Sequence, residues 1–209
     1  MRDNQKIPEI LLKLKAVSLR TNPPYKWASG ILAPIYTDNR ILISYQKERD
    51  FIVDSFLRLL NKNKIKFDGF AGTATAGIPW ASFLAQKTKK PMVYVRSGLK
   101  EHGKENLVEG IVEKEKRYVV VEDLISTGGS PVNTITAVRQ QGGVVENCIA
   151  IFTYQLGKSK ANFENAKCRL HTLTDFTVLI EAASKKKYIN SPQKSTIMKW
   201  KENPERWNP

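Results

Sequence analysis

The clearest pattern in the chain is an alternation of short apolar runs with longer amphipathic stretches. The apolar runs are rich in β-branched residues and predict strands buried on both faces, at Phe67–Phe70, Met92–Val95, Val119–Val121 and Val144–Tyr154. The amphipathic stretches between them predict helices over 47–61, 79–88 and 131–141. Strands that alternate with helices are typical of an α/β fold with a largely parallel central sheet flanked by helices.

The two ends of the chain have a different pattern. Residues 7–19 place apolar side chains at helical spacing, and the Pro- and Trp-containing segment that follows predicts a small hood over the sheet. Near the other end, residues 161–183 are expected to form a helix, a short pair of strands and a second helix. The predicted organisation is one domain over 1–209, with a hood over 1–45, an α/β core over 46–183 and a basic segment over 184–209.

Two acids end the buried strand and lead into a hydroxyl- and glycine-rich turn. Glu122 and Asp123 follow Val119–Val121, and residues 126–130 read Ser-Thr-Gly-Gly-Ser. Ser130 is expected to cap a helix that has Pro131 at its first position. Backbone N–H groups at such a helix start favour a phosphate, and carboxylates beside it suit ribose hydroxyls or a hydrated Mg²⁺. The stretch therefore predicts a site for a phosphorylated sugar.

Other phosphate motifs do not fit this turn. A P-loop needs a lysine after its glycines, whereas Gly128-Gly129 is followed by Ser130-Pro131, and the Gly-x-Gly-x-x-Gly spacing of dinucleotide sites is absent from the sequence. The alternative without a ligand is an ordinary strand–loop–helix connection with solvated acids.

A second glycine-rich turn and a charged loop complete the candidate site. Residues 71–77 follow the first strand of the sheet and can present N–H groups to another phosphate. Residues 96–110 are polar and are expected to form a mobile lid, in which Arg96, Lys100 and His102 close over a negatively charged leaving group. Taken alone, each of these loop residues is equally compatible with a solvated surface.

Composition limits the remaining classes of function. The net charge is +14, but residues 1–20 carry +3 and residues 184–209 carry +5, so no basic stripe marks the centre as a nucleic-acid site. No apolar run reaches membrane-spanning length, and no secretory signal is recognisable. Cys148 and Cys168 give neither a disulfide framework nor a metal spacing, which suits a cytoplasmic location.

The motifs together resemble a type I phosphoribosyltransferase, and more narrowly an orotate phosphoribosyltransferase of the bacterial kind. The superfamily motif is Val120-Val-Glu-Asp-Leu-Ile-Ser-Thr-Gly-Gly-Ser130, and the turn Ala71-Gly-Thr-Ala-Thr-Ala-Gly77 supports it. The orotate branch is indicated by Trp27-Ala-Ser-Gly30, by Pro34-Ile-Tyr-x-Asp-Asn-Arg40, and by Arg96 with Lys100-x-His102-Gly103. The resemblance covers most of the chain.

This resemblance implies a reaction and a set of sites. Ribose 5-phosphate would pass from phosphoribosyl pyrophosphate to orotate, giving orotidine 5′-monophosphate and pyrophosphate. Lys100, His102 and Asp123 would be the catalytic residues, and Arg40 and Ser126 would contact orotate. Phosphoribosyl pyrophosphate would contact Thr75, Ala76, Arg96, Lys100, His102, Glu122, Asp123, Leu124, Ile125, Ser126, Thr127, Gly128, Gly129 and Ser130.

The resemblance also implies a metal and an assembly. Mg²⁺ would be held through the substrate and water, with Glu122 and Asp123 as candidate ligands. The chain would form a homodimer in which the loop over 96–110 enters the neighbouring subunit's site, with no membrane or nucleic-acid partner. For Arg40, a surface salt bridge is the alternative to a contact with orotate.

Two positions depart from the family pattern and leave base selectivity open. The chain reads Leu32-Ala33-Pro34 where relatives commonly have Lys-Ser-Pro, and it has Gly98 where many carry a lysine. One alternative is therefore a phosphoribosyltransferase for another base, such as a purine. The other, of a different class, is a non-catalytic regulator that senses phosphoribosyl pyrophosphate and binds RNA.

Overall fold

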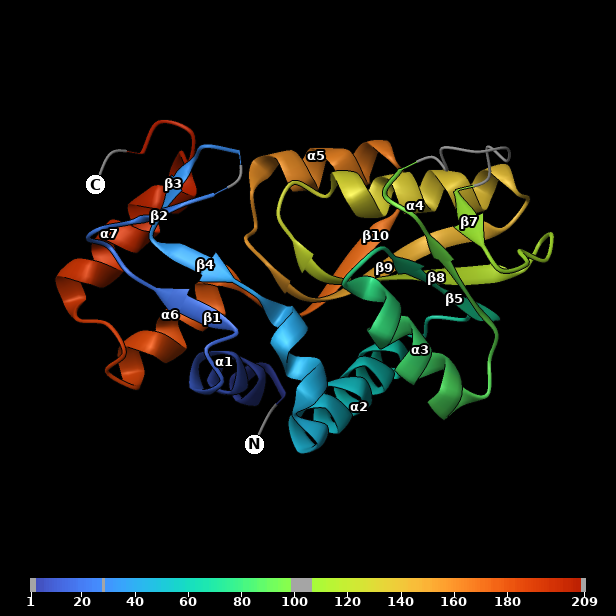
Figure 1. Ribbon diagram of the computed structural model, residues 1–209, viewed down its shortest axis with the longest axis horizontal. Helices are drawn as coiled ribbons and strands as arrows, with labels where there is room; N and C mark the ends of the chain where they lie inside the picture. The colour runs from blue at the N-terminus through green and yellow to red at the C-terminus, as the bar shows by residue number, and fades with distance from the viewer. Residues whose placement is uncertain (1–2, 28, 99–106, 208–209) are drawn as a thin grey trace.

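A six-stranded sheet forms the centre of the computed structural model, which describes residues 3–27, 29–98 and 107–207 (Figure 1). Neighbouring strands are parallel except β6 and β7, which pair antiparallel. Across the sheet the order is β10 (Arg169–Asp175), β9 (Val144–Thr153), β8 (Arg117–Ile125), β5 (Gly69–Thr73), β6 (Met92–Val95) and β7 (Val108–Glu109). The largely parallel sheet confirms the predicted α/β fold.

Helices cover both faces of this sheet (Figure 1). One face carries α2 (Gln46–Lys62) and α3 (Gly77–Thr88), and the other carries α4 (Gly129–Gln140) and α5 (Gly157–Asn165). The apolar run of β8 divides between the two layers, because Val119 and Val121 pack into one hydrophobic cluster and Val120 into the other. A strand that is buried on both faces needs such a continuous apolar run.

The remaining elements form the hood, and they come from both ends of the chain (Figure 1). The N-terminal part pairs β1 with β4 and β2 with β3, both antiparallel. Its elements are α1 (Asp3–Lys13), β1 (Val17–Leu19), β2 (Tyr25–Lys26), β3 (Leu32–Ala33), β4 (Ile35–Thr37) and the 3-10 helix η1 (Asn39–Ser44). The C-terminal part consists of α6 (Phe176–Lys185) and α7 (Ser191–Glu202).

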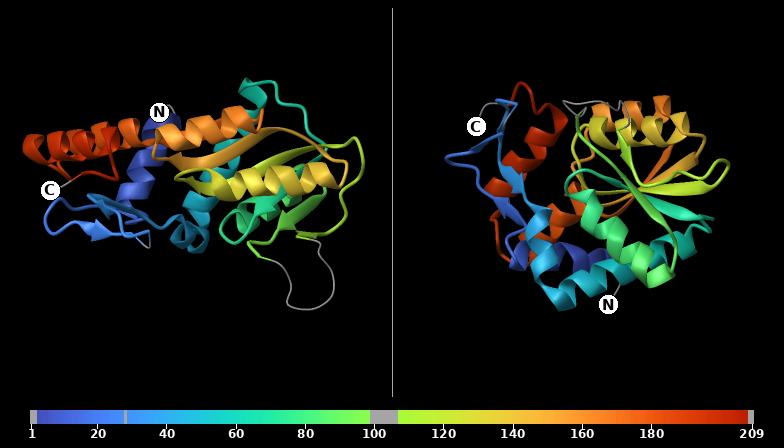
Figure 2. Two further views of the ribbon diagram at one scale, coloured as in Figure 1. Left: turned by 90° about the horizontal axis from the view of Figure 1, so that it is seen from above. Right: turned by 45° about the vertical axis from the view of Figure 1, so that its right-hand side comes forward.

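Aromatic side chains join the two parts of the hood to the sheet. The indole of Trp200 on α7 donates to the carbonyl oxygen of Leu32 at 3.1 Å. The ring of Trp27 lies 5.4 Å from that of Trp200 and 4.9 Å from that of Tyr154, which directly follows β9. Figure 2 shows the hood at one end of the long axis and the sheet at the other. The hood is therefore anchored at the carboxyl end of the sheet.

Three element predictions were wrong. The loop expected over 96–110 contains a strand, because Val108–Glu109 pair with β6 as β7. The helix expected over 7–19 ends at Lys13, and Val17–Leu19 form a strand instead. Val17 and Leu19 are separated by the polar Ser18, which is the alternation of a strand, and this segment pairs with β4. Val17 also falls at helical spacing from Leu14 and Ile10, which led to the wrong prediction. The strand pair expected within 161–183 is the one strand β10, and the carboxylate of Asp175 then caps α6 by accepting from the N–H of Val178.

Within the described residues, no helix combines the length and the apolar character needed to cross a membrane.

Candidate active site

The acid pair lies inside β8, close to its carboxyl end. Glu122 and Asp123 are both buried, and the backbone N–H of Asp123 donates to Oε1 of Glu122 at 3.0 Å. The sequence placed the strand over Val119–Val121, whereas β8 extends to Ile125. The ladder with β9 continues through Glu122 and Leu124, and it therefore holds the acids on rigid backbone.

Burial changes the ionisation of both acids. Loss of solvation raises the pKa of Glu122 well above its usual value, and the nearby charge of Asp123 raises it further. Burial also raises the pKa of Asp123, although hydrogen bonds to its carboxylate and the charge of Arg40 act against this. The side-chain hydrogen bond between the two acids raises the pKa of Glu122 and lowers that of Asp123. Such a pair is ready to accept a cation or hydroxyl donors.

The turn after β8 leads into α4 with exposed donors. Within the part of the chain that the structure describes, the N–H groups of Thr127, Gly128, Gly129 and Ser130 have no hydrogen-bond acceptor. The side chain of Asn162 on α5 holds this turn by donating to the carbonyl oxygen of Thr127 at 2.9 Å. Free donors at a helix start form an anion site.

The predicted start of this helix was wrong by about two residues. Gly128 is the N-cap of α4, with a φ of +81°, and the helix begins at Gly129. Ser130 is thus inside the helix, and Pro131 is its third residue. The backbone at Gly128 is left-handed, and the helix therefore begins directly after it. Ser130 has a Cβ, so it could adopt this conformation as an N-cap only at a cost.

The turn after β5 presents a second helix start beside β8. Gly77 opens α3, and a Cβ on it would lie 2.2 Å from the carbonyl oxygen of Val121. Only glycine therefore allows α3 to begin against the strand that carries the acids. Of the two residues predicted to contact the substrate here, Thr75 is exposed and Ala76 is half-buried. Thr73 has a buried hydroxyl with no hydrogen-bond partner among the described residues.

One cavity brings the two turns and the start of the charged loop together. It has a volume of about 280 Å³, and its lining includes Thr73 and Ala74 from the first turn, Ser130 from the second, and Arg96 with Ser97 from the loop. The guanidinium of Arg96 lies 3.8 Å from the carboxylate of Glu109, which is an ion pair too long for a hydrogen bond. Its buried Nη1 can therefore still donate to a ligand.

The hood closes over the acids through η1. Asn39 is fully buried, and its Nδ2 donates to the backbone carbonyl oxygen of Asp123 at 2.9 Å. Sequence reasoning assigned no role to Asn39, and the only available signal was its place between Asp38 and Arg40. This bond fixes the hood to the strand that carries the acids, 84 residues further along the chain.

Arg40 forms the salt bridge that was the alternative to its predicted contact with orotate. Nε donates to Oδ1 of Asp38 at 2.7 Å and Nη2 to Oδ2 at 2.9 Å. This pairing raises the pKa of Arg40 and lowers that of Asp38. The Arg40 side chain is 64% exposed, so the pair contributes at most about 1 kcal/mol, and it can be released for a ligand.

The structure places the other predicted site residues unequally. Ile125 is fully buried, so only its backbone is accessible to a ligand, whereas Leu124 and Ser126 are half-buried. Lys100 and His102 lie outside the described residues. The ends of their segment do meet, because the N–H of Arg96 donates to the carbonyl oxygen of Leu107 at 3.0 Å.

The chemistry of the acid pair fits Mg²⁺. Carboxylate oxygens are hard ligands, and a divalent cation would offset the repulsion between two neighbouring buried acids. Within the described ranges, no cluster of three or more His, Cys, Asp or Glu side chains forms a protein-only metal cage. Glu122 and Asp123 are the residues that would hold the ion, together with substrate oxygens and water.

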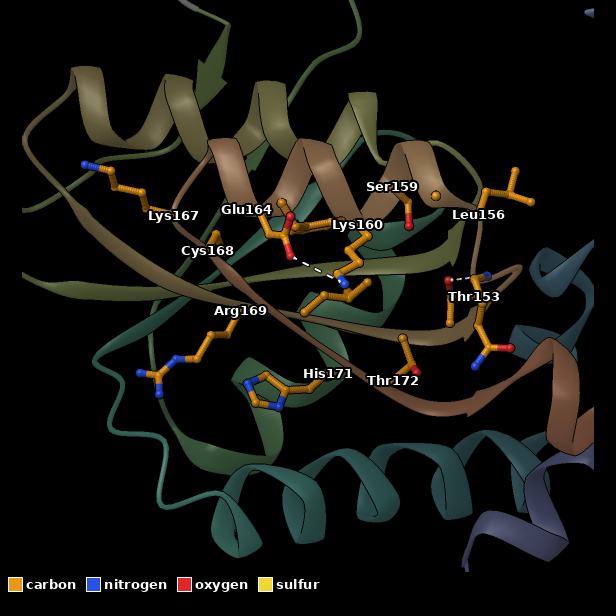
Figure 3. Close-up of a pocket in the computed structure, with 14 residues that line it drawn as sticks. Thr153, Leu156, Ser159, Lys160, Glu164, Lys167, Cys168, Arg169, His171 and Thr172 are labelled. Carbon is orange, nitrogen blue, oxygen red and sulfur yellow. Dashed lines mark hydrogen bonds and ion pairs between the residues drawn. The ribbon is translucent and has the colours of Figure 1, made fainter. Parts of the chain in front are cut away.

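A larger cavity of about 740 Å³ lies beside α5 and β10 (Figure 3). An ion pair between Lys160 and Glu164, with an N–O distance of 3.9 Å, spans part of it. Among the predicted site residues none lines this cavity.

Known proteins resemble this chain over its whole length. Residues 43–187 match the family model described as phosphoribosyl transferase domain. An orotate phosphoribosyltransferase of Coxiella burnetii is 46% identical over 209 residues, covering 100% of both chains, and one of Listeria innocua is 45% identical over 207 residues, covering 99% of both. The crystal structure of an orotate phosphoribosyltransferase from Aeropyrum pernix superposes with a TM-score of 0.76 at 28% identity, covering 88% of this chain and 99% of that one.

Proposed function

Because this chain belongs to the orotate phosphoribosyltransferase family, we propose that it transfers ribose 5-phosphate from phosphoribosyl pyrophosphate to orotate. The products are orotidine 5′-monophosphate and pyrophosphate, a step of pyrimidine synthesis. The observation that carries the proposal is the free N–H groups that lead into α4 beside the buried acids, next to a cavity that Thr73, Ala74, Ser130 and Arg96 line together. A substrate with a phosphate at one end and a pyrophosphate at the other needs two phosphate-binding turns.

The two ends of the substrate are assigned to different turns. The 5′-phosphate binds the free N–H groups of 127–130, and the pyrophosphate lies against the turn after β5 and near Arg96. Glu122 and Asp123 accept hydrogen bonds from the ribose hydroxyls between them. Glu122 and Asp123, with substrate oxygens and water, would hold Mg²⁺, which would supply positive charge against the pyrophosphate.

The reaction breaks the bond between the anomeric carbon and the pyrophosphate oxygen, and it forms a bond from that carbon to a ring nitrogen of orotate. Positive charge develops on the sugar and negative charge on the leaving group. The buried carboxylate of Asp123 stabilises the positive sugar, while Arg96, Lys100 and His102 stabilise the pyrophosphate. No covalent intermediate with the chain is needed.

Arg40 and Ser126 are the proposed contacts of orotate. Arg40 stands on the segment that η1 fixes against Asp123, and its charge already acts on that carboxylate. In the bound state the guanidinium would exchange Asp38 for the carboxylate of orotate. If so, replacing Arg40 by alanine raises the KM for orotate far more than the KM for phosphoribosyl pyrophosphate.

One assay separates this function from its alternatives. Purified protein is incubated with phosphoribosyl pyrophosphate, Mg²⁺ and one base at a time from a panel of orotate, uracil, adenine and hypoxanthine, and released pyrophosphate is measured. The proposal requires orotate to be preferred over uracil, because uracil lacks the carboxylate for which Arg40 would exchange Asp38. Preference for a purine would overturn the base assignment, and no release with any base would favour a regulator.

We further propose a homodimer in which Lys100 and His102 act in the partner's site. Lys100→Ala should lower kcat by about 10² or more, as expected for a charge that acts mainly in the transition state. Mixing this variant with an Asp123→Asn variant should restore activity in heterodimers, because one site then has both intact parts. Heterodimers that form but stay inactive would exclude the shared site. A cytoplasmic location is also proposed, since Cys148 and Cys168 are free thiols.

A further inference from the structure

A third cavity, here called the amino-end pocket, lies at the opposite end of the sheet from the acids. It has a volume of about 290 Å³ and is formed where β8 and β10 begin and where the chain leaves α2. Its lining includes Lys64, Lys66, Arg117 and Arg169. Arg117 stands five residues before Glu122 on β8, so roughly 17 Å separates the pocket from the active site at about 3.3 Å per residue.

The four cations of the amino-end pocket are exposed and outnumber the acids in its lining. Glu146 is the one acid in the lining, and none of the four forms an ion pair with any residue in the described ranges. Cations elsewhere do find such partners; Lys87 pairs with Asp54, and Lys194 with Glu181. Like charges gathered around one cavity repel each other, and an anion between them removes that cost.

The nearest other acid does not neutralise the pocket. Oδ2 of Asp68 accepts from the backbone N–H of Arg117 at 2.9 Å, so it does not bind the guanidinium. That hydrogen bond lowers the pKa of Asp68, and the charges of Lys116, Arg117 and Lys90 lower it further. Of these three cations, Arg117 lines the pocket.

Neutral groups in the wall of the pocket are held in place. Asn147 is buried, and its Oδ1 lies 3.1 Å from Nε2 of His171, which leaves the amide NH₂ of Asn147 available as a donor. Arg169 and His171 lie side by side on β10 and line both this pocket and the larger cavity beside α5 (Figure 3). Residues 64–66 lie just beyond the end of α2 and line the pocket together with Arg169 and His171. A fixed amide and two guanidinium groups are suited to the oxygens of a phosphate.

We propose that the amino-end pocket binds a small phosphate-bearing anion, independently of the active site. The volume equals that of about ten water molecules at roughly 30 Å³ each, which accommodates one or two phosphate groups but not a folded partner. Free pyrophosphate and the diphosphate of a nucleotide share the chemistry that this pocket recognises. The proposal does not depend on which base the enzyme uses.

The chain offers a direct probe, because it has two histidines, His102 and His171. Protein with ¹⁵N-labelled histidine is titrated in low-salt, phosphate-free buffer with orthophosphate, pyrophosphate or a nucleoside 5′-diphosphate, and His171→Gln assigns the signals. The His171 signal should shift in a saturable way, with pyrophosphate binding at least tenfold tighter than orthophosphate. If pyrophosphate and the nucleotide bind with equal affinity, the pocket recognises their phosphates alone. If the nucleotide binds more tightly, the pocket also contacts its nucleoside.

Paired variants test whether the pocket itself is responsible. Lys66→Gln with Arg169→Gln should weaken pyrophosphate binding at least tenfold, while leaving the thermal midpoint and the basal rate unchanged. Lys187→Gln with Lys199→Gln removes the same charge from exposed positions away from the pocket and should change binding less than twofold. The proposal fails if the His171 signal does not saturate, or if both double variants bind alike. It also fails if a twelve-nucleotide RNA shifts this signal while pyrophosphate does not.

Discussion

The turns after β5 and β8 each lead into a helix and flank the same cavity, which Thr73 and Ala74 line on one side and Ser130 on the other, but the chain fixes the two turns by different means. Space limits the turn after β5, because a Cβ on Gly77 would meet the carbonyl oxygen of Val121. Conformation and charge limit the turn after β8, because Gly128 is left-handed and two buried acids precede it. Substitutions in the first turn should therefore affect folding first, and those in the second should affect ligand binding and chemistry first.

The largest effect is expected for Gly77→Ala. The added methyl group would lie 2.2 Å from a carbonyl oxygen of the central strand, so α3 or β8 must move. We expect a loss of roughly 3 kcal/mol or more in the free energy of unfolding, measured by urea denaturation.

Gly157→Ala is the matched control, because Gly157 also begins a helix but a Cβ there meets nothing within 4 Å. It should change the free energy of unfolding by less than about 0.5 kcal/mol. If Gly77→Ala is as stable as this control, the turn after β5 is not limited by space.

Asp123→Asn should separate chemistry from folding in the second turn. We expect kcat/KM to fall by about 10² or more, or roughly 2.7 kcal/mol, because the ribose loses a charged acceptor. The thermal midpoint should stay equal or rise slightly, since a carboxylate that burial disfavours has been removed. Asp54→Asn makes the same change at an exposed ion pair and should leave kcat/KM unaltered. Unchanged kcat/KM in Asp123→Asn would remove the assigned contact.

Gly128→Ala tests the left-handed helix start. A side chain at a φ of +81° costs about 1–2 kcal/mol of stability, and the new Cβ would lie 3.0 Å from the ring of Phe163. Because the free N–H groups would shift with the turn, the KM for phosphoribosyl pyrophosphate should rise about tenfold.

Gly142→Ala provides the comparison for this variant. Gly142 has a φ of +89° just after α4, and its Cβ would meet only the flexible side chain of Lys114. It should lose similar stability without any change in KM. Equal KM values for the two variants would show that the backbone at Gly128 does not position the phosphate.

Sequence alone predicted much of the sheet, because buried parallel strands leave a local signal. Met92–Val95 was placed correctly, and the acids and glycines of residues 122–130 identified the phosphate turn. Local patterns failed where a distant partner decides the structure. Val17–Leu19 is a strand because β4 pairs with it, and α4 begins at Gly129 because Gly128 packs on α5.

The hood shows the same limit at a longer range. The indole of Trp200 donates to Leu32 across 168 residues, and Asn39 donates to Asp123 across 84. No periodicity in the sequence links such residues, so the basic segment over 184–209 gave no sign that its helix completes the hood. Charge had a similar limit, since a net count cannot show that cations gather at the amino-end pocket.

The smallest effect concerns pH, and it belongs to the turn after β8 alone. Burial raises the pKa of Glu122 above its ordinary 4.5, so the folded protein keeps a proton that the unfolded chain has lost. The stabilisation from this proton is complete below pH 4.5 and is lost as pH rises through the raised pKa. The residue at 122 cannot titrate in Glu122→Gln. As pH rises from 5 to 8, the free energy of unfolding of this variant should therefore increase relative to that of the wild type, measured by urea titration without ligand. Glu181→Gln is the control, because a hydrogen bond from Lys194 lowers the pKa of Glu181 from its ordinary 4.5, so this variant's difference from the wild type should stay constant from pH 5 to pH 8 and change only at lower pH. The turn after β5 has no such dependence, because residues 74–76 contain no titratable group. If the difference in free energy of unfolding between the wild type and Glu122→Gln also stays constant from pH 5 to pH 8, the acid pair is not held as an uncompensated buried charge.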